Sequence, residues 1–375
     1  MIYRRFGKTE QQLSPFSLGT MRLVDCPEAV ATETVVRAVE RGINHIETAQ
    51  AYGISEARLG KILATELASQ RDRLTITTKL APTLSPQKLR EGLERSLERL
   101  QLDSIDNFAF HGINLPDHLQ AVMEGGLEVI QQAIREGLVR HVGFSTHGSL
   151  ELILAAIATQ SFEFVNLHYY YFNQHNQAAI ELARQNDMGV FIISPADKGG
   201  MLYRPPQVLE QLCQPFSPLE FGYRFLLDDP AIHTLSLGAA DPGDLDAALA
   251  SLEPSEAWEQ RGTAIAQTLE ETLQQKLSTD RCAQCHECLP CPADINIPAA
   301  LRLRNLDVAF DMTEYAQYRY NMFEKAGHWF WGQKGDRCTE CGDCLPRCPE
   351  QLDIPKLLFD THDRLNIRTI RRLWE

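Results

Sequence analysis

The sequence predicts an α/β chain of two parts: a (β/α)8 barrel of the TIM type over residues 1–275, then a small, mostly α-helical domain over residues 276–375. Three observations lead to this fold class. The chain has 375 residues, more than one compact domain of ordinary size and enough for two. Short β-rich apolar runs alternate with longer helical patterns through residues 14–250. Eight of the ten cysteines lie between Cys282 and Cys348, so the composition changes where the second domain is expected.

The expected barrel strands are eight short runs that are apolar and rich in β-branched and aromatic residues. They cover residues 16–18, 45–47, 74–79, 105–110, 141–144, 165–168, 189–193 and 233–237. Helical patterns between them cover residues 28–41, 56–68, 86–100 and 150–159. The third helix has one apolar stripe of leucines at 89, 93, 97 and 100, and it begins with Ser85 as a cap and Pro86 in its first turn.

Eight strands, each followed by a helix, favour a closed parallel barrel. The rival architecture is a doubly wound open sheet, which normally carries a glycine-rich turn after its first strand. Here the first strand runs into Leu18-Gly19-Thr20-Met21, which contains no such turn. The barrel is therefore the preferred interpretation.

The overall composition excludes several classes of protein. With 44% hydrophobic and 23% charged residues the chain is globular, and its formal net charge of −14 leaves no excess of cations for nucleic-acid phosphates. No apolar run approaches the roughly 18 residues of a membrane-spanning helix. The charged start of the chain lacks the apolar core of a secretory signal. We therefore expect a cytoplasmic protein that binds neither nucleic acid nor membrane.

Four polar side chains lie near the ends of consecutive strands, which is where function gathers in a barrel of this type. Glu47, Lys79 and His111 end strands two, three and four, and Tyr52 follows Glu47 by five residues. A tyrosine hydroxyl, with an ordinary pKa of about 10, can donate a proton to a carbonyl oxygen. A nearby ammonium would lower that pKa, a carboxylate would hold the ammonium, and a histidine would orient the substrate oxygen.

Each of these residues also has an ordinary structural explanation. A lysine at a strand end is usually a solvated charge, a lone histidine is usually a satisfied core residue, and a tyrosine in a loop usually packs there. Their joint position at consecutive strand ends favours catalysis instead. The sequence therefore predicts Tyr52, Lys79, His111 and Glu47 as catalytic residues.

Eight cysteines form two quartets in the second domain. The quartets read Cys282-x2-Cys285-x2-Cys288-x2-Cys291-Pro292 and Cys338-x2-Cys341-x2-Cys344-x3-Cys348-Pro349. Three thiolates at this spacing can wrap three corners of a four-iron cluster, and a fourth before proline usually ligates the other cluster. By that rule, one [4Fe-4S] cluster takes Cys282, Cys285, Cys288 and Cys348. The other takes Cys338, Cys341, Cys344 and Cys291.

Zinc and disulfide bonds explain the quartets less well. A structural zinc site needs two cysteine pairs rather than triplets with a distant fourth member. Disulfide bonds are rare in cytosolic proteins. His286 lies inside the first motif and could in principle be a ligand, but it is more simply a bystander. We expect two [4Fe-4S] clusters.

The first domain resembles the aldo-keto reductase superfamily over about 270 residues. The matching stretches are Tyr3-Arg-Arg-Phe-Gly-Lys-Thr, Ser17-Leu-Gly-Thr-Met-Arg, Gly42-Ile-Asn-His-Ile-Glu-Thr-Ala-Gln-Ala-Tyr-Gly-Ile-Ser-Glu56, Thr78-Lys79, Asp106 to His111, and Val142-Gly-Phe-Ser-Thr. The resemblance implies a barrel that reduces a small carbonyl substrate with NADPH or NADH. It places Tyr52, Lys79 and His111 at the family's catalytic positions. Glu47 stands where the family has an aspartate, so its carboxylate lies one methylene further from the backbone, and we expect it still to pair with Lys79.

The resemblance also implies a cofactor groove. Its expected residues are Gly19, Thr20, Met21, Ser145, Thr146, Asn166, Ser194 and Gly238. Thr146 replaces the commoner asparagine, and Ile193 stands where an aromatic residue often stacks on the nicotinamide. The family's phosphate-binding segment aligns with residues 238–245, which contain Asp241 and Asp244 but no basic residue. The choice between NADPH and NADH therefore stays open, and we expect weak discrimination between them.

The second domain resembles α-helical two-cluster ferredoxin domains over about 80 residues. Beside the cysteines, a short repeat places Ile-Pro soon after each Cys-Pro, in Asn296-Ile-Pro-Ala-Ala-Leu and Leu352-Asp-Ile-Pro-Lys-Leu. Proline there suits the first turn of a helix. A barrel reductase with such a tail is a subgroup of the aldo-keto reductases, and this chain resembles that subgroup from end to end.

Together these features predict an NAD(P)H-dependent aldo-keto reductase that converts a carbonyl to an alcohol. Its two [4Fe-4S] clusters would exchange single electrons with a redox partner such as a ferredoxin. The alternative is an electron-transfer or redox-sensing protein whose barrel binds nicotinamide with little turnover. That alternative stays open because a nicotinamide gives two electrons as hydride, a cluster takes one, and no flavin motif is visible to split them.

Overall fold

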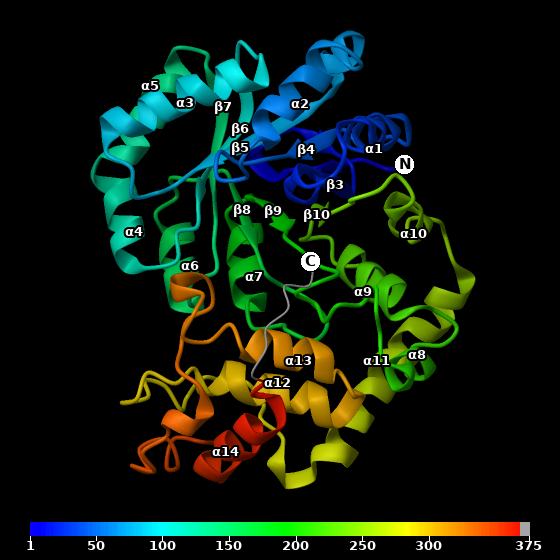
Figure 1. The fold of residues 1–375 in the computed structure, drawn as a ribbon, viewed down its shortest axis with the longest axis vertical. Helices are drawn as coiled ribbons and strands as arrows, with labels where there is room; N and C mark the ends of the chain where they lie inside the picture. Colours follow the sequence, from blue (N-terminus) through cyan, green and yellow to red (C-terminus); the bar gives the residue numbers. More distant parts are fainter. Residues whose placement is uncertain (368–375) are drawn as a thin grey trace. The chain divides into compact units, whose positions relative to one another are not determined.

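Eight parallel strands close into a barrel in the first part of the chain (Figure 1). The computed structural model describes residues 1–367. The strands are β3 (Phe16–Gly19), β4 (His45–Glu47), β5 (Thr75–Leu80), β6 (Ile105–His111), β7 (Val139–Ser145), β8 (Phe164–Leu167), β9 (Gly189–Ile192) and β10 (Thr234–Leu237). They pair in the order β10-β3-β4-β5-β6-β7-β8-β9, and β10 closes on β3. The (β/α)8 barrel is confirmed, with every strand within two residues of its expected position.

A short antiparallel hairpin, which the sequence analysis missed, precedes the barrel. It consists of β1 (Arg4–Arg5) and β2 (Gln12–Leu13). Phe6 and Leu13 are buried in one cluster with Ala109, Phe164 and Phe191. Phe6 packs tightly against the start of β9, because a Cβ atom on Gly189 would lie 2.6 Å from the Phe6 ring. Since Gly189 begins β9, the hairpin covers the amino end of the barrel and leaves the carboxyl ends of the strands for the site.

Helices connect successive strands and cover the outside of the barrel (Figure 1). They are α1 (Glu28–Glu40), α2 (Ser55–Ala64), α3 (Pro86–Leu100), α4 (Pro116–Ala121), α5 (Leu127–Arg135), α6 (Leu150–Ala158) and α7 (Gln177–Gln185). Helix α3 is as expected: the Ser85 hydroxyl accepts a hydrogen bond from the Lys88 amide at 3.4 Å, and its four stripe leucines are buried. Helix α2 ends earlier than expected, and a 3₁₀ turn (Ala68–Arg73) follows it.

The chain divides into two compact units. One contains Met1–Gly199 and Gly222–Pro254, and the other contains Gly200–Phe221 and the chain from Ser255 onward. Helices α8 (Gln207–Leu212) and α9 (Pro218–Leu227) lie between β9 and β10 in the sequence, and α10 (Asp244–Ala250) follows β10. The boundary expected after residue 275 falls near the end of α11 (Glu256–Leu277), and as a domain boundary it stays a prediction.

The second unit is helical between its two cysteine segments. Its further helices are α12 (Ile297–Phe310), α13 (Thr313–Tyr320) and α14 (Ile354–Leu365). Helices α12 and α14 each begin at the Ile-Pro pair of the short repeat. The side chain that precedes each pair caps the helix: Asn296 accepts from the Ala299 amide, and Asp353 accepts from the Lys356 amide, both at 3.3 Å. The sequence repeat is therefore a repeat of helix starts. Among the described residues, no helix combines the length and apolar character needed to cross a membrane.

Candidate functional site

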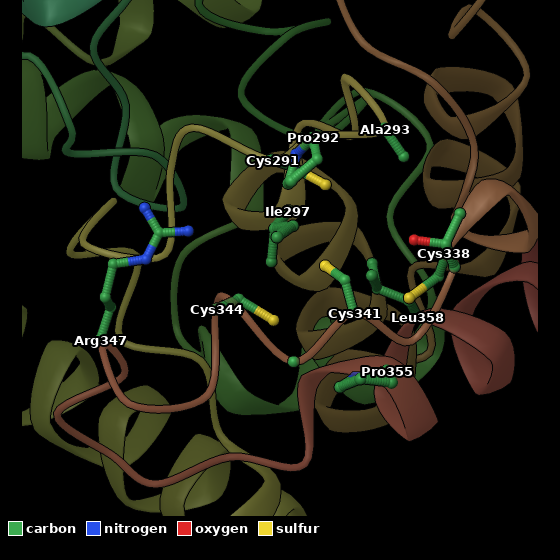
Figure 2. Close-up of a pocket in the computed structure, with 12 residues that line it drawn as sticks. Cys291, Pro292, Ala293, Ile297, Cys338, Cys341, Cys344, Arg347, Pro355 and Leu358 are labelled. Carbon is green, nitrogen blue, oxygen red and sulfur yellow. The ribbon is translucent and has the colours of Figure 1, made fainter.

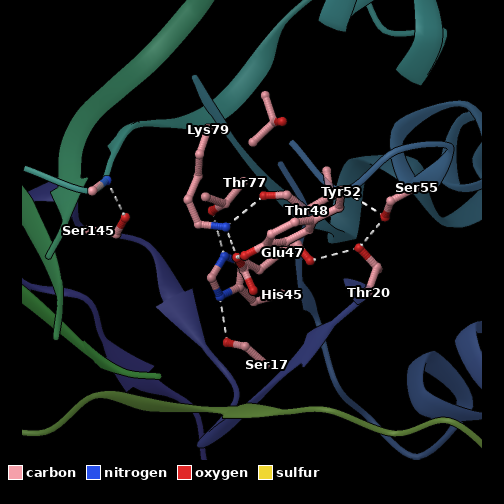
Figure 3. Close-up of polar contacts among 12 residues, drawn as sticks. Ser17, Thr20, His45, Glu47, Thr48, Tyr52, Ser55, Thr77, Lys79 and Ser145 are labelled. Carbon is pink, nitrogen blue, oxygen red and sulfur yellow. Dashed lines mark hydrogen bonds and ion pairs between the residues drawn. The ribbon is translucent and has the colours of Figure 1, made fainter. Parts of the chain in front are cut away.

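A buried ion pair lies at the carboxyl ends of β4 and β5. The Lys79 ammonium is in direct contact with the Glu47 carboxylate, and the two side chains are 2% and 6% exposed. The ammonium also donates a hydrogen bond to the Thr48 carbonyl oxygen at 2.7 Å. Figure 3 shows the Lys79 side chain reaching toward both partners. The expectation that Glu47 pairs with Lys79 is confirmed.

Tyr52 and His111 join this pair, so the structure brings all four predicted catalytic residues together. The Tyr52 hydroxyl lies 3.5 Å from Glu47 Oε1. The Lys79 Nζ atom lies 5.0 Å from the centre of the Tyr52 ring. The His111 ring meets the Tyr52 ring edge to face, with centroids 5.5 Å apart. Since they come from β4, the loop after it, β5 and β6, the group forms one side of the barrel mouth.

Burial sets the protonation of this group. It raises the pKa of Tyr52 to about 12, so the hydroxyl is protonated at neutral pH. Burial, reinforced by the charges of Lys79 and Lys198, lowers the pKa of His111 to about 3 and leaves the imidazole neutral. Burial also lowers the pKa of Lys79, and the adjoining Glu47 carboxylate acts in the opposite direction.

The expected lowering of the Tyr52 pKa by an ammonium was wrong for this geometry. Lys79 lies over the face of the ring rather than against the hydroxyl, and the Glu47 carboxylate balances its charge. Desolvation of the phenol therefore decides the direction of the shift.

A layer of polar side chains fills the barrel next to the ion pair, and the sequence analysis did not identify it. His45 lies between Ser17 and Thr77, with its ring nitrogens 2.5 and 2.7 Å from their hydroxyl oxygens. Ser17 also contacts the Thr234 hydroxyl at 2.6 Å. Burial, and then the charge of Lys79, lower the pKa of His45 to about 3, so it is neutral. The sequence did contain a signal for this layer, because its polar residues occupy inward positions of β3, β4, β5 and β10.

Ser145 and Asn166 lie side by side in the expected cofactor groove, at paired positions of β7 and β8. The Ser145 hydroxyl accepts a hydrogen bond from the Gly112 amide at 3.0 Å. Asn166 is fully buried, yet neither its amide nitrogen nor its amide oxygen has a hydrogen-bond partner within residues 1–367. A buried amide in this state calls for a ligand that both donates and accepts. The carboxamide of a nicotinamide fits that requirement.

Other expected groove residues fall into two groups. Thr20 and Thr146 are buried and use their hydroxyls within the protein, toward the carbonyl oxygens of Glu47 and Ile113 at 3.0 and 2.7 Å. Gly19, Met21, Ser194 and Gly238 all follow or end strands at the barrel mouth. A Cβ atom on Gly19 would lie 2.9 Å from the Ser236 hydroxyl, so a larger residue here would require that side chain to shift. Met21 is 53% exposed.

In the segment after β10, two aspartate side chains accept hydrogen bonds from backbone amides of the same segment. Asp244 accepts from the Ala240 amide at 2.9 Å, and Asp241 accepts from the Gly243 amide at 2.6 Å. These carboxylates therefore occupy two of the backbone donors that could otherwise face a phosphate. The sequence analysis missed Arg22, whose guanidinium donates to the Gly238 carbonyl oxygen at 3.1 Å. It brings a cation to this segment from the loop after β3.

The eight motif cysteines line two cavities in the second unit. One cavity is lined by Cys338, Cys341, Cys344 and Cys291. Figure 2 shows these four sulfur-bearing side chains facing one space beside Ile297 and Leu358. The second cavity is lined by Cys282, Cys285, Cys288 and Cys348. Each cavity thus takes three cysteines from one motif and the fourth from the other, in the same two sets that the exchange rule predicts.

The chemistry of the two cavities suits multinuclear clusters. Burial raises the pKa of Cys282 to about 11 and that of Cys288 to about 12, so these thiols need a strong cation to become thiolates. Within the described part of the chain, no three His, Cys, Asp or Glu side chains gather closely enough for a single metal ion. A four-iron cluster binds each thiolate at a different iron, so its ligands lie further apart.

Comparison with known proteins gives the chain its family. The family model described as aldo/keto reductase family matches residues 15–209, just over half of the chain. The chain belongs to the aldo/keto reductase family. A second family model, described as 4Fe-4S dicluster domain, matches residues 281–352 and supports iron–sulfur clusters in this aldo/keto reductase.

Individual relatives of this aldo/keto reductase match it over part of their length. It is 38% identical to aflatoxin B1 aldehyde reductase member 2 of Rattus norvegicus over 142 residues, which are 36% of this chain and 37% of that protein. It is 35% identical to methylglyoxal reductase DkgB of Escherichia coli O157:H7 over 149 residues, 39% of this chain and 53% of that protein. The matched region thus spans about a third to a half of these two relatives.

A solved structure confirms the fold of this aldo/keto reductase. Aldo-keto reductase AKR11C1 from Bacillus halodurans, in its holo form, matches with a TM-score of 0.63 and 21% sequence identity. The match covers 72% of this chain and 96% of that one. At this identity the likeness shows the barrel and nothing finer.

Proposed function

We propose that the protein is an NAD(P)H-dependent carbonyl reductase that also carries two [4Fe-4S] clusters. The observation that carries the proposal is the buried contact between Glu47 and Lys79, with Tyr52 and His111 beside it at the barrel mouth. A protonated phenol, a neutral imidazole and an ammonium converge there. Together they can receive the charge that develops on a carbonyl oxygen.

Tyr52 is the proposed proton donor. Its raised pKa keeps the proton on the hydroxyl until a substrate oxygen becomes basic enough to take it. Lys79 and Glu47 keep the Tyr52 ring in position, because the ammonium lies 5.0 Å from the ring centre and the carboxylate that holds it lies 3.5 Å from the hydroxyl. His111 is neutral because its pKa is about 3, and its proposed role is to orient the same oxygen by a hydrogen bond without delivering a proton of its own.

Ser145 and Asn166 are the side chains that would hold the carboxamide of the nicotinamide, because Asn166 offers a buried donor and acceptor. Gly19, Thr20, Met21, Thr146, Ser194 and Gly238 are the further proposed groove residues. A bound nicotinamide would supply the hydride. The fixed positions of Ser145 and Asn166 on paired strands would set which face of the ring meets the substrate.

The two cysteine sets would hold the two clusters, in a domain that we place from about residue 276 onward. A bound cluster would supply a site for one electron, whereas carbonyl reduction moves two. We therefore propose that the clusters serve exchange with a one-electron redox partner, such as a ferredoxin, separately from the chemistry at Tyr52.

Protein purified without oxygen tests the proposal. NADPH or NADH is mixed with a panel of simple aldehydes, and aldehyde-dependent oxidation of the nicotinamide is measured. We expect turnover in the wild type and a loss of at least about 10²–10⁴-fold in kcat for Tyr52→Phe, with nicotinamide binding nearly unchanged. The matched control is Tyr3→Phe, since Tyr3 is exposed and its hydroxyl donates to the Gly42 carbonyl oxygen at 3.1 Å.

Two results would contradict the proposal. Unchanged turnover in Tyr52→Phe would show that another group delivers the proton. Absence of aldehyde-dependent turnover in a wild type whose absorption spectrum shows intact clusters would favour the alternative, an electron-transfer or redox-sensing protein that binds nicotinamide.

A further inference from the structure

The two cysteine motifs differ in length by one residue, and that residue is an arginine. The first motif ends in Cys288-Leu-Pro-Cys291-Pro, and the second ends in Cys344-Leu-Pro-Arg-Cys348-Pro. Both contain the same Leu-Pro step, so the second motif differs by the insertion of Arg347 before its last cysteine. The proposed reduction of a carbonyl makes no use of this residue.

The guanidinium of Arg347 binds the first motif at the point where that motif is shorter. Its Nη1 and Nη2 atoms donate to the carbonyl oxygens of Leu289 and Pro290, at 2.7 and 2.9 Å. Its Nε atom donates to the Asp343 carbonyl oxygen of the second motif at 2.9 Å. Arg347 therefore ties the loop before Cys291 to the motif that supplies the other three cysteines of the same cavity.

The charged side chains beside the two cavities are of opposite sign. We call the cysteines of one cavity the Cys338 set (Cys338, Cys341, Cys344 and Cys291) and those of the other the Cys282 set (Cys282, Cys285, Cys288 and Cys348). Among the described residues that line the cavity of the Cys338 set, Arg347 is the only lysine, arginine, aspartate or glutamate (Figure 2). At the cavity of the Cys282 set, Glu350 has that place, and His286 also lines it.

The charge of Arg347 is not neutralised by a carboxylate within residues 1–367, because its three hydrogen bonds all go to uncharged carbonyl oxygens. A guanidinium keeps its charge throughout the pH range in which proteins work. The cavity of the Cys338 set therefore has a permanent cation in its wall.

A cation and an anion act in opposite directions on a bound iron–sulfur cluster. Four thiolates outweigh the positive charge of the iron–sulfide core, so a cluster with four cysteine ligands is an anion, and uptake of one electron makes it more negative. A neighbouring guanidinium stabilises the reduced form and raises the reduction potential, whereas a neighbouring carboxylate lowers it.

We propose that Arg347 makes the two cluster sites unequal: it holds Cys291 in the Cys338 set and supplies the cation that gives this set the higher reduction potential. Glu350 acts in the opposite direction on the Cys282 set. A single electron from a one-electron partner then reduces the site of the Cys338 set first. Arg347 is thus a positioning residue and not a catalytic one. This inference rests on the proposed function, because that function includes the two clusters.

The test is a redox titration of protein purified without oxygen, in which dithionite supplies the electrons and electron paramagnetic resonance follows the two clusters. The wild type should show two different potentials. Arg347→Gln should lower the higher one by about 59 mV, a tenfold change in a one-electron equilibrium constant, and should lower the other one less. Arg347→Lys, which keeps the charge but loses the forked donors, should recover most of the higher potential.

A second variant and a control separate the charge from the contacts of Arg347. Glu350 is exposed, so Glu350→Gln should raise the lower potential by less than about tenfold in the equilibrium constant, since water screens this charge. The control is Arg337→Gln. Arg337 directly precedes Cys338, but its side chain is 59% exposed and pairs with Glu324 at 3.1 Å, so its loss should move either potential far less than Arg347→Gln does.

Iron content separates failure of this inference from failure of the proposed function. A wild type that contains no iron overturns both. Loss of the iron of one cluster from Arg347→Gln, but not from Arg337→Gln, supports the holding role, and Glu350→Gln then decides the role of charge. Intact clusters whose potentials are equal in the wild type, or that Arg347→Gln and Glu350→Gln leave unmoved, overturn the inference and leave the proposed function intact.

Discussion

Replacing Glu47 by glutamine should destabilise the barrel, because it removes the carboxylate from a buried ammonium while keeping the size of the side chain. Lys79 is 2% exposed and would retain the Thr48 carbonyl oxygen as its other hydrogen-bond partner in this site. Removing one member of a buried ion pair costs about 3–5 kcal/mol, since an uncompensated charge stays in the interior. We expect Glu47→Gln to lose about 3 kcal/mol of the free energy of unfolding of the barrel at pH 7.

The loss of unfolding free energy caused by Glu47→Gln should depend on pH, and its direction follows from the pKa of Lys79. Burial holds the pKa of Lys79 in the folded protein below its value in the unfolded chain, and removing the carboxylate lowers it further. Between the folded and the unfolded pKa values the unfolded chain binds more protons, so the free energy of unfolding rises with pH. The destabilisation by Glu47→Gln is therefore largest where Glu47 is ionised and Lys79 is charged in the folded wild type. It shrinks as the pH rises through the folded pKa of Lys79, which burial holds below the ordinary value of about 10.5.

Hydrogen exchange read by mass spectrometry in peptides that cover β4 and β5 measures this effect in the barrel by itself. The chain has two compact units, and a global unfolding curve would mix their transitions. Glu98→Gln, an exposed position on α3, is the control and should change little. A loss below about 1 kcal/mol at pH 7, or a loss that stays constant up to about pH 9.5, would refute the reasoning.

Three further predictions concern bound groups. Protein purified without oxygen should contain about eight iron atoms per chain; zinc without iron would contradict the cluster assignment. Cys291→Ser should disturb the cluster in the cavity lined by Cys338, Cys341 and Cys344, and not the cluster held by the neighbouring Cys282, Cys285 and Cys288. Electron paramagnetic resonance of the two clusters can check this. Asp244→Arg should free the Ala240 amide and add a cation, tightening NADPH by about 1–2 kcal/mol more than NADH. Titration of both cofactors tests this, and a wild-type preference for NADPH above about a hundredfold would show that Arg22 or another residue already supplies the clamp.

The sequence was sufficient for the features that repeat along the chain. The barrel strands were predictable because each is a short apolar run at a regular spacing. The grouping of the four proposed catalytic residues was predictable because parallel strands bring their ends to one mouth. The division of the eight cysteines between two cavities followed from the spacing and from Pro292 and Pro349 alone. The β1–β2 hairpin was missed because two-residue strands carry no periodic signal.

Features that depend on distances between loops could not be predicted. The direction of the Tyr52 pKa shift depends on whether Lys79 lies over the ring or against the hydroxyl, and no spacing in the sequence decides that. The contact of Arg22 with Gly238, and the contacts of His168 with His147 and Lys198, join residues from separate connections. Such contacts depend on loop conformations, which have no sequence period.

The exchange of cysteines between the two motifs has a consequence for how the second unit is made. Neither four-cysteine set is complete until the segment from Cys338 to Cys348 has been synthesised, because each cavity needs members of both motifs. During translation, the first motif and helices α12 and α13 therefore emerge before any cluster can be closed. Once bound, each cluster would cross-link the same two distant segments, and its binding energy would become folding energy for the helices between them. Maturation of the clusters would thus be the final and cooperative step of folding, and loss of one would loosen the ligands of the other.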